Sequence, residues 1–275
     1  MLFDIWLNNV NLVRETQAQI GYKQCLDYLQ KTLSEFADTV LLQPFVLDDL
    51  VDEKSYDLTN IIARFKVDEP KQLLIGAHWD TRPWADEDPV PEKRNDPIIG
   101  ANDGASGVAV ILELARILNA SPPPIGITLV LFDGEDMGRS GNPKSYAQGS
   151  LAFAKDLPIE KPDEAIILDM IGDAELHIPI ERYSFQQNRQ LVKKLWGLAK
   201  VLSLDAFESR IEYSIYDDHV PLWTEAKIPA VDIIDFNYPN SYTNYWHTTQ
   251  DLPENCSAES LGQVGTLLVH YIYGR

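Results

Sequence analysis

Histidine and carboxylate side chains follow several apolar runs of this 275-residue chain. His78 directly follows the run 73–77. Asp136 lies just beyond the run 127–132, and Asp169 lies near the end of a third run. Carboxylates that gather at one place repel each other unless they share a cation, and Zn²⁺ accepts both imidazole and carboxylate ligands. These residue types therefore predict a zinc site, where the metal polarises a carbonyl group and a carboxylate moves protons.

Two further candidate ligands lie in loops. Asp103 lies in the segment 100–107, whose glycines permit tight backbone turns before a helix. His247 lies in the loop that follows the apolar run 230–236. Taken alone, Asp103 is typical of a helix cap and His247 of a hydrogen-bonded loop histidine. Only the convergence of all these groups at one edge of a sheet favours a metal site.

The adjacent acids Glu135 and Asp136 add a mechanism to the predicted site. Consecutive residues at a turn can point in different directions, so one carboxylate can bind a metal while its neighbour faces the reacting atoms. We assign Asp136 to the metal and Glu135 to proton transfer as a general base or acid.

The elements that must position these residues follow from the spacing of apolar residues. Strands are expected at 40–46, 61–67, 73–77, 127–132, 165–171 and 230–236. Helices are expected at 15–36, 105–118, 147–155, 186–202 and 258–273, and a surface loop at 82–97. Strands and helices alternate, and several strands lack a polar face. This pattern predicts an α/β fold with a mixed, mainly parallel central sheet flanked by helices on both faces.

The length and composition are typical of one soluble globular domain, and we expect a single catalytic domain covering 1–275. Lys and Arg number 23 against 42 Asp and Glu, so the net charge of −19 argues against nucleic acid as a partner. Two cysteines, Cys25 and Cys256, cannot form a disulfide framework, and no apolar run is long enough for a membrane span. Residues 1–13 do not have the pattern of a secretory leader. We expect a cytoplasmic protein, or an exported one that has lost its leader.

The motifs together resemble the zinc-dependent glutaminyl cyclases, also called glutaminyl-peptide cyclotransferases, which share their fold with di-zinc aminopeptidases. The resemblance extends from about Leu73 to the C-terminus. It is carried by His78-Trp79-Asp80, Gly100-Ala101-Asn102-Asp103, Phe132-Asp133-Gly134-Glu135-Asp136, Leu168-Asp169-Met170-Ile171-Gly172, Asp217-Asp218-His219 and Trp246-His247-Thr248. The tryptophan directly before His247 and the doubled acid before His219 are similar to the cyclase pattern.

The resemblance implies a set of roles for these residues. A single zinc would be held by Asp103, Asp136 and His247. Glu135 would be the proton shuttle, and Asp169 and Asp217 would form an acidic hydrogen-bond relay with it. Trp246 would line the substrate pocket. The implied reaction converts the N-terminal glutamine of a peptide with a free N-terminus to pyroglutamate and releases ammonia. A monomer is favoured.

The sequence also departs from the animal cyclases. Asp136 stands where those enzymes have glutamate, Asp232 stands where they have a histidine, and the segment 137–141 lacks their pocket tryptophan. Trp84 or a tyrosine of the segment 238–245 is expected to supply the missing wall of the pocket.

Two other functions stay open. In a di-zinc aminopeptidase, His78 and Asp169 would bind a second zinc, Asp103 would bridge the two ions, and Glu135 would activate a water molecule. In a binding module without activity, the same fold would carry a decayed site. The occupied ligand and base positions argue against that module.

Overall fold

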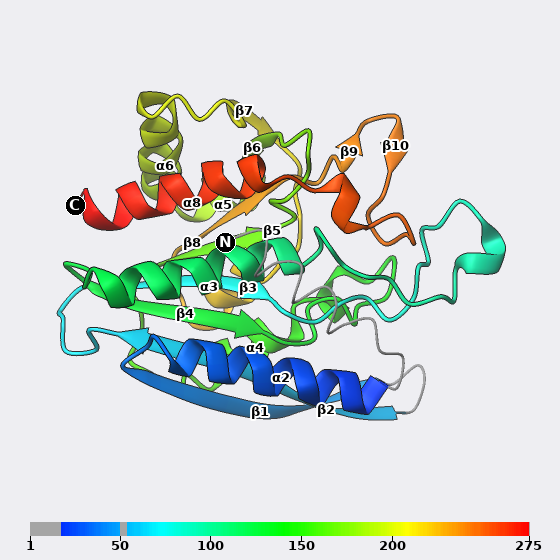
Figure 1. The fold of residues 1–275 in the computed structure, drawn as a ribbon, viewed down its shortest axis with the longest axis horizontal. Coiled ribbons are helices and arrows are strands. Elements are labelled where there is room, and N and C mark those ends of the chain that lie inside the picture. Colours follow the sequence, from blue (N-terminus) through cyan, green and yellow to red (C-terminus); the bar gives the residue numbers. More distant parts are fainter. Residues whose placement is uncertain (1–17, 50–53, 275) are drawn as a thin grey trace.

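The protein is built around a six-stranded sheet, seen in a computed structural model that describes residues 18–49 and 54–274 (Figure 1). In spatial order the strands are β1 (Thr39–Asp49), β2 (Lys54–Phe65), β4 (Gly126–Phe132), β3 (Gln72–His78), β5 (Glu164–Asp169) and β8 (Ala230–Ile234). The neighbours from β4 to β8 are parallel, whereas β1 and β2 form an antiparallel pair that joins β4. The sheet is therefore mixed and mainly parallel, which confirms the predicted fold class.

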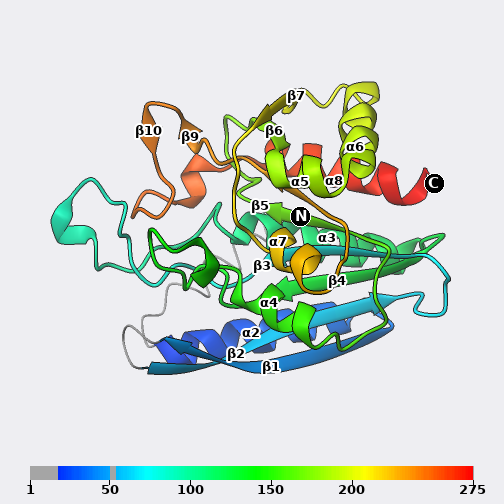
Figure 2. The same ribbon diagram turned by 180° about the vertical axis from the view of Figure 1, so that it is seen from behind.

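Helices cover both faces of this sheet. They are α2 (Ala18–Ser34), α3 (Ala105–Ala120), α4 (Gln148–Lys155), α5 (Arg182–Gln187), α6 (Arg189–Val201), α7 (His219–Thr224) and α8 (Ala258–Tyr273). Helices α2, α3 and α8 lie on the face seen in Figure 1, and α4 and α7 lie on the face seen in Figure 2. Along β3, Leu73 and Ile75 point to the first face and Leu74 to the second. Burial on both faces explains why these strands have no polar face.

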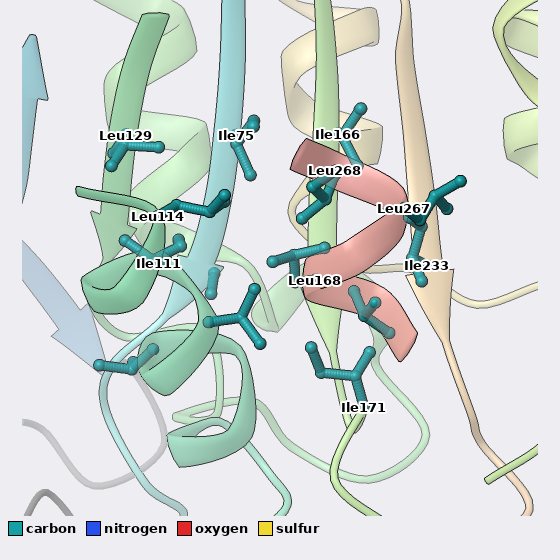
Figure 3. Packing of buried hydrophobic residues seen from close by; sticks show 14 of the residues in the cluster. Ile75, Ile111, Leu114, Leu129, Ile166, Leu168, Ile171, Ile233, Leu267 and Leu268 are labelled. Atoms are coloured by element: carbon teal, nitrogen blue, oxygen red, sulfur yellow. The ribbon is translucent and has the colours of Figure 1, made fainter. Parts of the chain in front are cut away.

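The larger part of the core lies between the sheet and helices α3 and α8. Figure 3 shows Leu114 of α3 and Leu268 of α8 beside the strand residues Ile75 and Ile166. All four side chains are at most 1% exposed. This layer fixes the sheet whose edge carries the candidate site.

The Leu268→Ala substitution is expected to destabilise the protein by about 2–5 kcal/mol, because it leaves a cavity under α8. Urea unfolding measures this loss. Val201→Ala is the matched control, because Val201 is 80% exposed. It should change the free energy of unfolding by less than about 0.5 kcal/mol. Equal stability of Leu268→Ala and the unchanged protein would contradict the packing in Figure 3.

Several boundaries differ from the sequence prediction. The expected helix 186–202 is two helices, because Asn188 leaves the helical conformation and its side chain caps the first turn of α6. The strands β6 (Ile178–Glu181) and β7 (Phe207–Glu212) form a small parallel sheet that was not predicted, since β7 has no buried face. A short antiparallel pair, β9 (Pro239–Asn240) and β10 (Thr243–Asn244), was also missed.

The chain before Ala18 lies outside the described residues, so the first residues of the expected helix 15–36 and the segment 1–13 are not tested. Within residues 18–49 and 54–274, no helix has both the length and the apolar character of a membrane span.

Candidate metal centre

The parallel strands bring the predicted site residues to one edge of the sheet. His78 is the last residue of β3, Asp169 is the last residue of β5, and Asp136 lies four residues after the end of β4. The carboxyl ends of parallel strands share an edge, and ligands of open α/β sheets bind there. Asp103 reaches this edge from the turn before α3, and His247 from the segment just after β10.

Asp103, Asp136 and His247 form one compact group at this edge. Nε2 of His247 lies 2.9 Å from Oδ1 of Asp136 and 3.6 Å from Oδ2 of Asp103. One ligand atom of each residue lies within 4.8 Å of the others, and all three side chains are buried. The structure thus brings together the three residues that the resemblance implied as zinc ligands.

A second group shares Asp103 with the first. Nε2 of His78 lies 3.1 Å from Oδ1 of Asp103 and 3.2 Å from Oδ1 of Asp169, and these side chains are also buried. The two groups therefore lie side by side, with Asp103 between them. This is the arrangement that a two-metal site would need.

Two carboxylates, the partly buried Asp80 and the buried Asp251, hold the loops that carry the ligands. Asp80 accepts hydrogen bonds of 3.0 Å from the backbone N–H groups of both Glu135 and Asp136. Asp251 accepts hydrogen bonds from the backbone N–H groups of Asn102 and Asp103, at 2.8 and 3.2 Å. Sequence reasoning missed Asp251, because no local pattern links it to a turn almost 150 residues earlier.

The electrostatics separate the two adjacent acids Glu135 and Asp136. Burial raises the pKa of Glu135 well above its usual value, and the charges of Asp136 and Asp217 raise it further. Burial also acts to raise the pKa of Asp136, but the charge of His247 and its hydrogen bond lower that pKa to about 2. Asp136 is therefore the ionised neighbour suited to a cation, and Glu135 is the one suited to exchange a proton.

A cavity of about 220 Å³ opens onto these groups. Glu135, Asp169 and Asp217 lie in its wall together with the first group of ligands. Its aromatic lining consists of Tyr146, Tyr216, Phe236 and Trp246. Trp246 therefore lies where the resemblance placed it. Tyr146 and Phe236 were not identified as pocket residues from the sequence. Phe236 lies just after the end of β8, and Tyr146 lies just before α4.

Trp84 lies away from this cavity. It lines a neighbouring cavity of about 460 Å³, and its ring packs against the guanidinium groups of Arg82 and Arg139, at 5.1 and 4.5 Å. None of the tyrosines in 238–245 lines the 220 Å³ cavity either. The expected replacement for the missing tryptophan is thus corrected, because Tyr146 supplies a ring beside the segment 137–141.

Asp217 connects the cavity to a deeper polar layer. Burial raises its pKa to about 6, and the charge of Asp169 adds to this effect. His219 and Asp232 lie behind it, and Asp217, His219 and Asp232 are again close enough to share an ion. Nε2 of His219 lies 3.3 Å from Glu181, and its Nδ1 lies 3.7 Å from Asp232. This layer surrounds Asp217 with buried ionisable side chains.

The donor set fits zinc. Oδ2 of Asp103 and Oδ2 of Asp136 are buried without a hydrogen-bond partner in the described part of the chain. Buried carboxylate oxygens without partners are costly, and a cation bound by them and by His247 would remove this cost. Two carboxylates and one imidazole make a three-ligand site, which leaves a fourth position for substrate.

An open α/β sheet with such a donor set at the carboxyl edge of its parallel strands defines a class of metalloenzymes that includes zinc exopeptidases. The model of peptidase family M28 matches residues 60–272. The chain belongs to this family, which confirms the superfamily that the motifs indicated.

Individual relatives are named either as glutaminyl cyclases or as zinc-dependent exopeptidases. The glutaminyl-peptide cyclotransferase of Boiga dendrophila is 24% identical over 247 residues, which make up 78% of this chain and 64% of the relative. A Zn-dependent exopeptidase from Parabacteroides distasonis has a TM-score of 0.92 and 32% identity, and the match covers 100% of this chain and 97% of that one. A glutaminyl cyclase of Bacteroides thetaiotaomicron, bound to N-acetylhistamine, has the same TM-score and coverage with 30% identity.

Proposed function

We propose that the protein is a zinc-dependent glutaminyl-peptide cyclotransferase with a single catalytic domain. The observation that carries this proposal is the small aromatic cavity in which Glu135, with a raised pKa, stands beside the group Asp103, Asp136 and His247. Relatives with that name support it. The chain spans about 64% of the length of the first of them, so the activity is our proposal for this chain.

Asp103, Asp136 and His247 would hold one zinc ion. When bound, the ion supplies Lewis-acid polarisation of the side-chain amide of an N-terminal glutamine and stabilises the negative charge that develops on its oxygen. The aromatic walls, including Trp246 and Tyr146, fold the glutamine side chain back toward the α-amine and exclude bulk water. The substrate is a peptide with a free N-terminus, and the enzyme is a monomer.

Glu135 performs the proton transfers. It takes a proton from the attacking α-amine and delivers it to the departing nitrogen, which leaves as ammonia. A raised pKa suits both steps, because the same carboxyl must accept and then donate near neutral pH. The negative charge of Asp217 helps to raise this pKa, and Asp169 lies in the wall of the same cavity.

The second candidate is a di-zinc aminopeptidase. It is favoured by the second group, His78, Asp103 and Asp169, and by the family to which the chain belongs. In that enzyme His78 and Asp169 would hold the second ion, and Glu135 would remove a proton from a water molecule.

A pair of dipeptides separates the two functions. The protein is incubated with Gln-Ala and with Leu-Ala, and ammonia and free amino acids are measured separately. The cyclotransferase releases ammonia from Gln-Ala and leaves the peptide bond intact. Release of free leucine from Leu-Ala without ammonia from Gln-Ala would overturn the proposal in favour of the aminopeptidase.

Asp217→Asn is expected to move the acidic limb of the pH profile to lower pH. The charge of Asp217 raises the pKa of Glu135, so its removal lets Glu135 lose its proton at lower pH. The measurement is kcat/KM for Gln-Ala against pH. Asp205→Asn removes one charge from a distant turn and serves as the control. An acidic limb that stays in place or moves to higher pH in Asp217→Asn would contradict the coupling.

A further inference from the structure

Nδ1 of His247 is the ring nitrogen that faces away from the proposed zinc ligands, and none of those ligands gives it a hydrogen-bond partner. Nε2 of His247 faces Asp136 and Asp103, so Nδ1 points away from the group. Nδ1 is buried and has no hydrogen-bond partner within the described residues. Histidines that bind metals are oriented by a carboxylate or carbonyl at the other nitrogen, and this partner also fixes the tautomer.

Asp86 is the carboxylate that faces this nitrogen. Its Oδ1 lies 3.7 Å from Nδ1 of His247, which is longer than a hydrogen bond, so the contact in this structure is electrostatic. The Asp86 side chain is 27% exposed, whereas that of His247 is 1% exposed. Asp86 therefore stands at the boundary between the buried site and solvent.

Arg82 holds Asp86 in this place. Its Nε and Nη2 donate paired hydrogen bonds of 2.7 and 2.6 Å to the two oxygens of Asp86. Its Nη1 donates to the backbone carbonyls of Asp136 and Gly138, at 2.8 and 3.0 Å. The paired geometry fixes the plane of the carboxylate, which a lysine could not do. One buried guanidinium thus links Asp86, the backbone of a candidate ligand and the segment 137–141.

Backbone contacts tie the two loops together at the same point. The N–H of Glu87 donates to the carbonyl of His247 at 3.2 Å, and Thr249 donates twice to Oδ2 of Asp88. His247 itself has a φ of 56°, which lies in the left-handed region. A non-glycine residue persists in that region only where its surroundings hold it. The backbone N–H of Glu87 and the side chain of Asp88 supply such a hold.

We propose that Arg82 and Asp86 are positioning residues for the metal centre, with Asp86 orienting the imidazole of His247 and Arg82 fixing Asp86 together with the backbone of Asp136. This inference rests on the zinc site of the proposed function. It adds residues to which neither the motifs nor the relatives' names assign a role. Burial acts to raise the pKa of Asp86, but the hydrogen bonds from Arg82 lower it overall, in agreement with an ionised partner for the imidazole.

The test is zinc affinity, measured by competition with a chromophoric chelator. Asp86→Asn keeps the shape of the side chain and removes its charge, and it is expected to weaken zinc binding by roughly 10- to 100-fold. Glu87→Gln removes the same charge from the next, exposed residue and is expected to leave the affinity unchanged. The visible spectrum of the Co²⁺-loaded protein gives a second readout, which should change in Asp86→Asn alone.

The outcomes distinguish this inference from the proposed function. Wild-type affinity and an unchanged Co²⁺ spectrum in Asp86→Asn would overturn the positioning role and leave the zinc site standing. An equal loss of zinc affinity in Glu87→Gln would mean that any negative charge in this loop has the same effect. That result would also overturn the positioning role of Asp86. Failure of the unchanged protein to bind zinc would remove the zinc site itself. Melting temperatures of the chelator-treated proteins verify that each variant is folded.

Discussion

Glu135→Gln is expected to abolish turnover of Gln-Ala while zinc stays bound. The substitution keeps the size of the side chain but removes the group that accepts and returns the proton, so kcat should fall by roughly 10²- to 10⁴-fold. Glu135 is buried, and its pKa is raised, so the neutral amide replaces a carboxyl group at little structural cost. The measurements are ammonia release and zinc content.

The matched control for this variant is Glu160→Gln. Glu160 lies on the surface, where it pairs with Arg64, and its side chain is 80% exposed. The Glu160→Gln variant should retain full activity. If Glu135→Gln keeps wild-type kcat with zinc bound, Glu135 is not the proton shuttle. If instead it loses zinc, the side chain belongs to the metal ligands and the division between Glu135 and Asp136 is wrong.

His247→Ala is expected to lower zinc affinity and zinc-dependent stability together. Loss of a direct ligand should weaken zinc binding by at least about 100-fold. This is more than the loss expected for most residues that only orient a ligand. At saturating zinc this corresponds to about 2.7 kcal/mol less stabilisation of the folded state. The measurement is urea unfolding with excess zinc and with chelator. The difference between the two conditions should shrink in the variant.

His270→Ala controls for the removal of a histidine as such. His270 lies on α8, is exposed, and its Nδ1 lies 3.0 Å from the carbonyl oxygen of Thr266 in the same helix. The zinc affinity of the His270→Ala variant should equal that of the unchanged protein. If His247→Ala retained wild-type affinity, the group Asp103, Asp136 and His247 would not be the zinc site.

The sequence predicted the strands β3, β4, β5 and β8 well because they are buried on both faces. Runs such as 127–132 are apolar except for Thr128, so their type and position follow largely from composition. The candidate ligands could be found for a related reason. His78 and Asp169 end such runs, and parallel strands must end at a common edge. The elements that were not predicted correctly from the sequence were short or half-exposed, such as β7, or were interrupted by a local helix cap, as at Asn188.

The residues around the site were harder to predict because they act through contacts between distant loops. Asp251 binds the turn at Asp103, 148 residues away in sequence, and Asp86 faces His247 from another loop. Neither residue stands in a local pattern that distinguishes it from a surface acid. Trp84 was misplaced for the same reason, since its type suggested a pocket wall but the loop turns it toward Arg82. Only the folded structure determines which loops meet.

The single zinc site is tested most directly by an anomalous difference map collected at the zinc absorption edge from crystals of the protein. We expect a single peak, enclosed by Asp103, Asp136 and His247. A second peak of similar height between His78 and Asp169 would contradict the single-zinc cyclotransferase and favour the aminopeptidase. A zinc peak at neither position would contradict the metal centre itself.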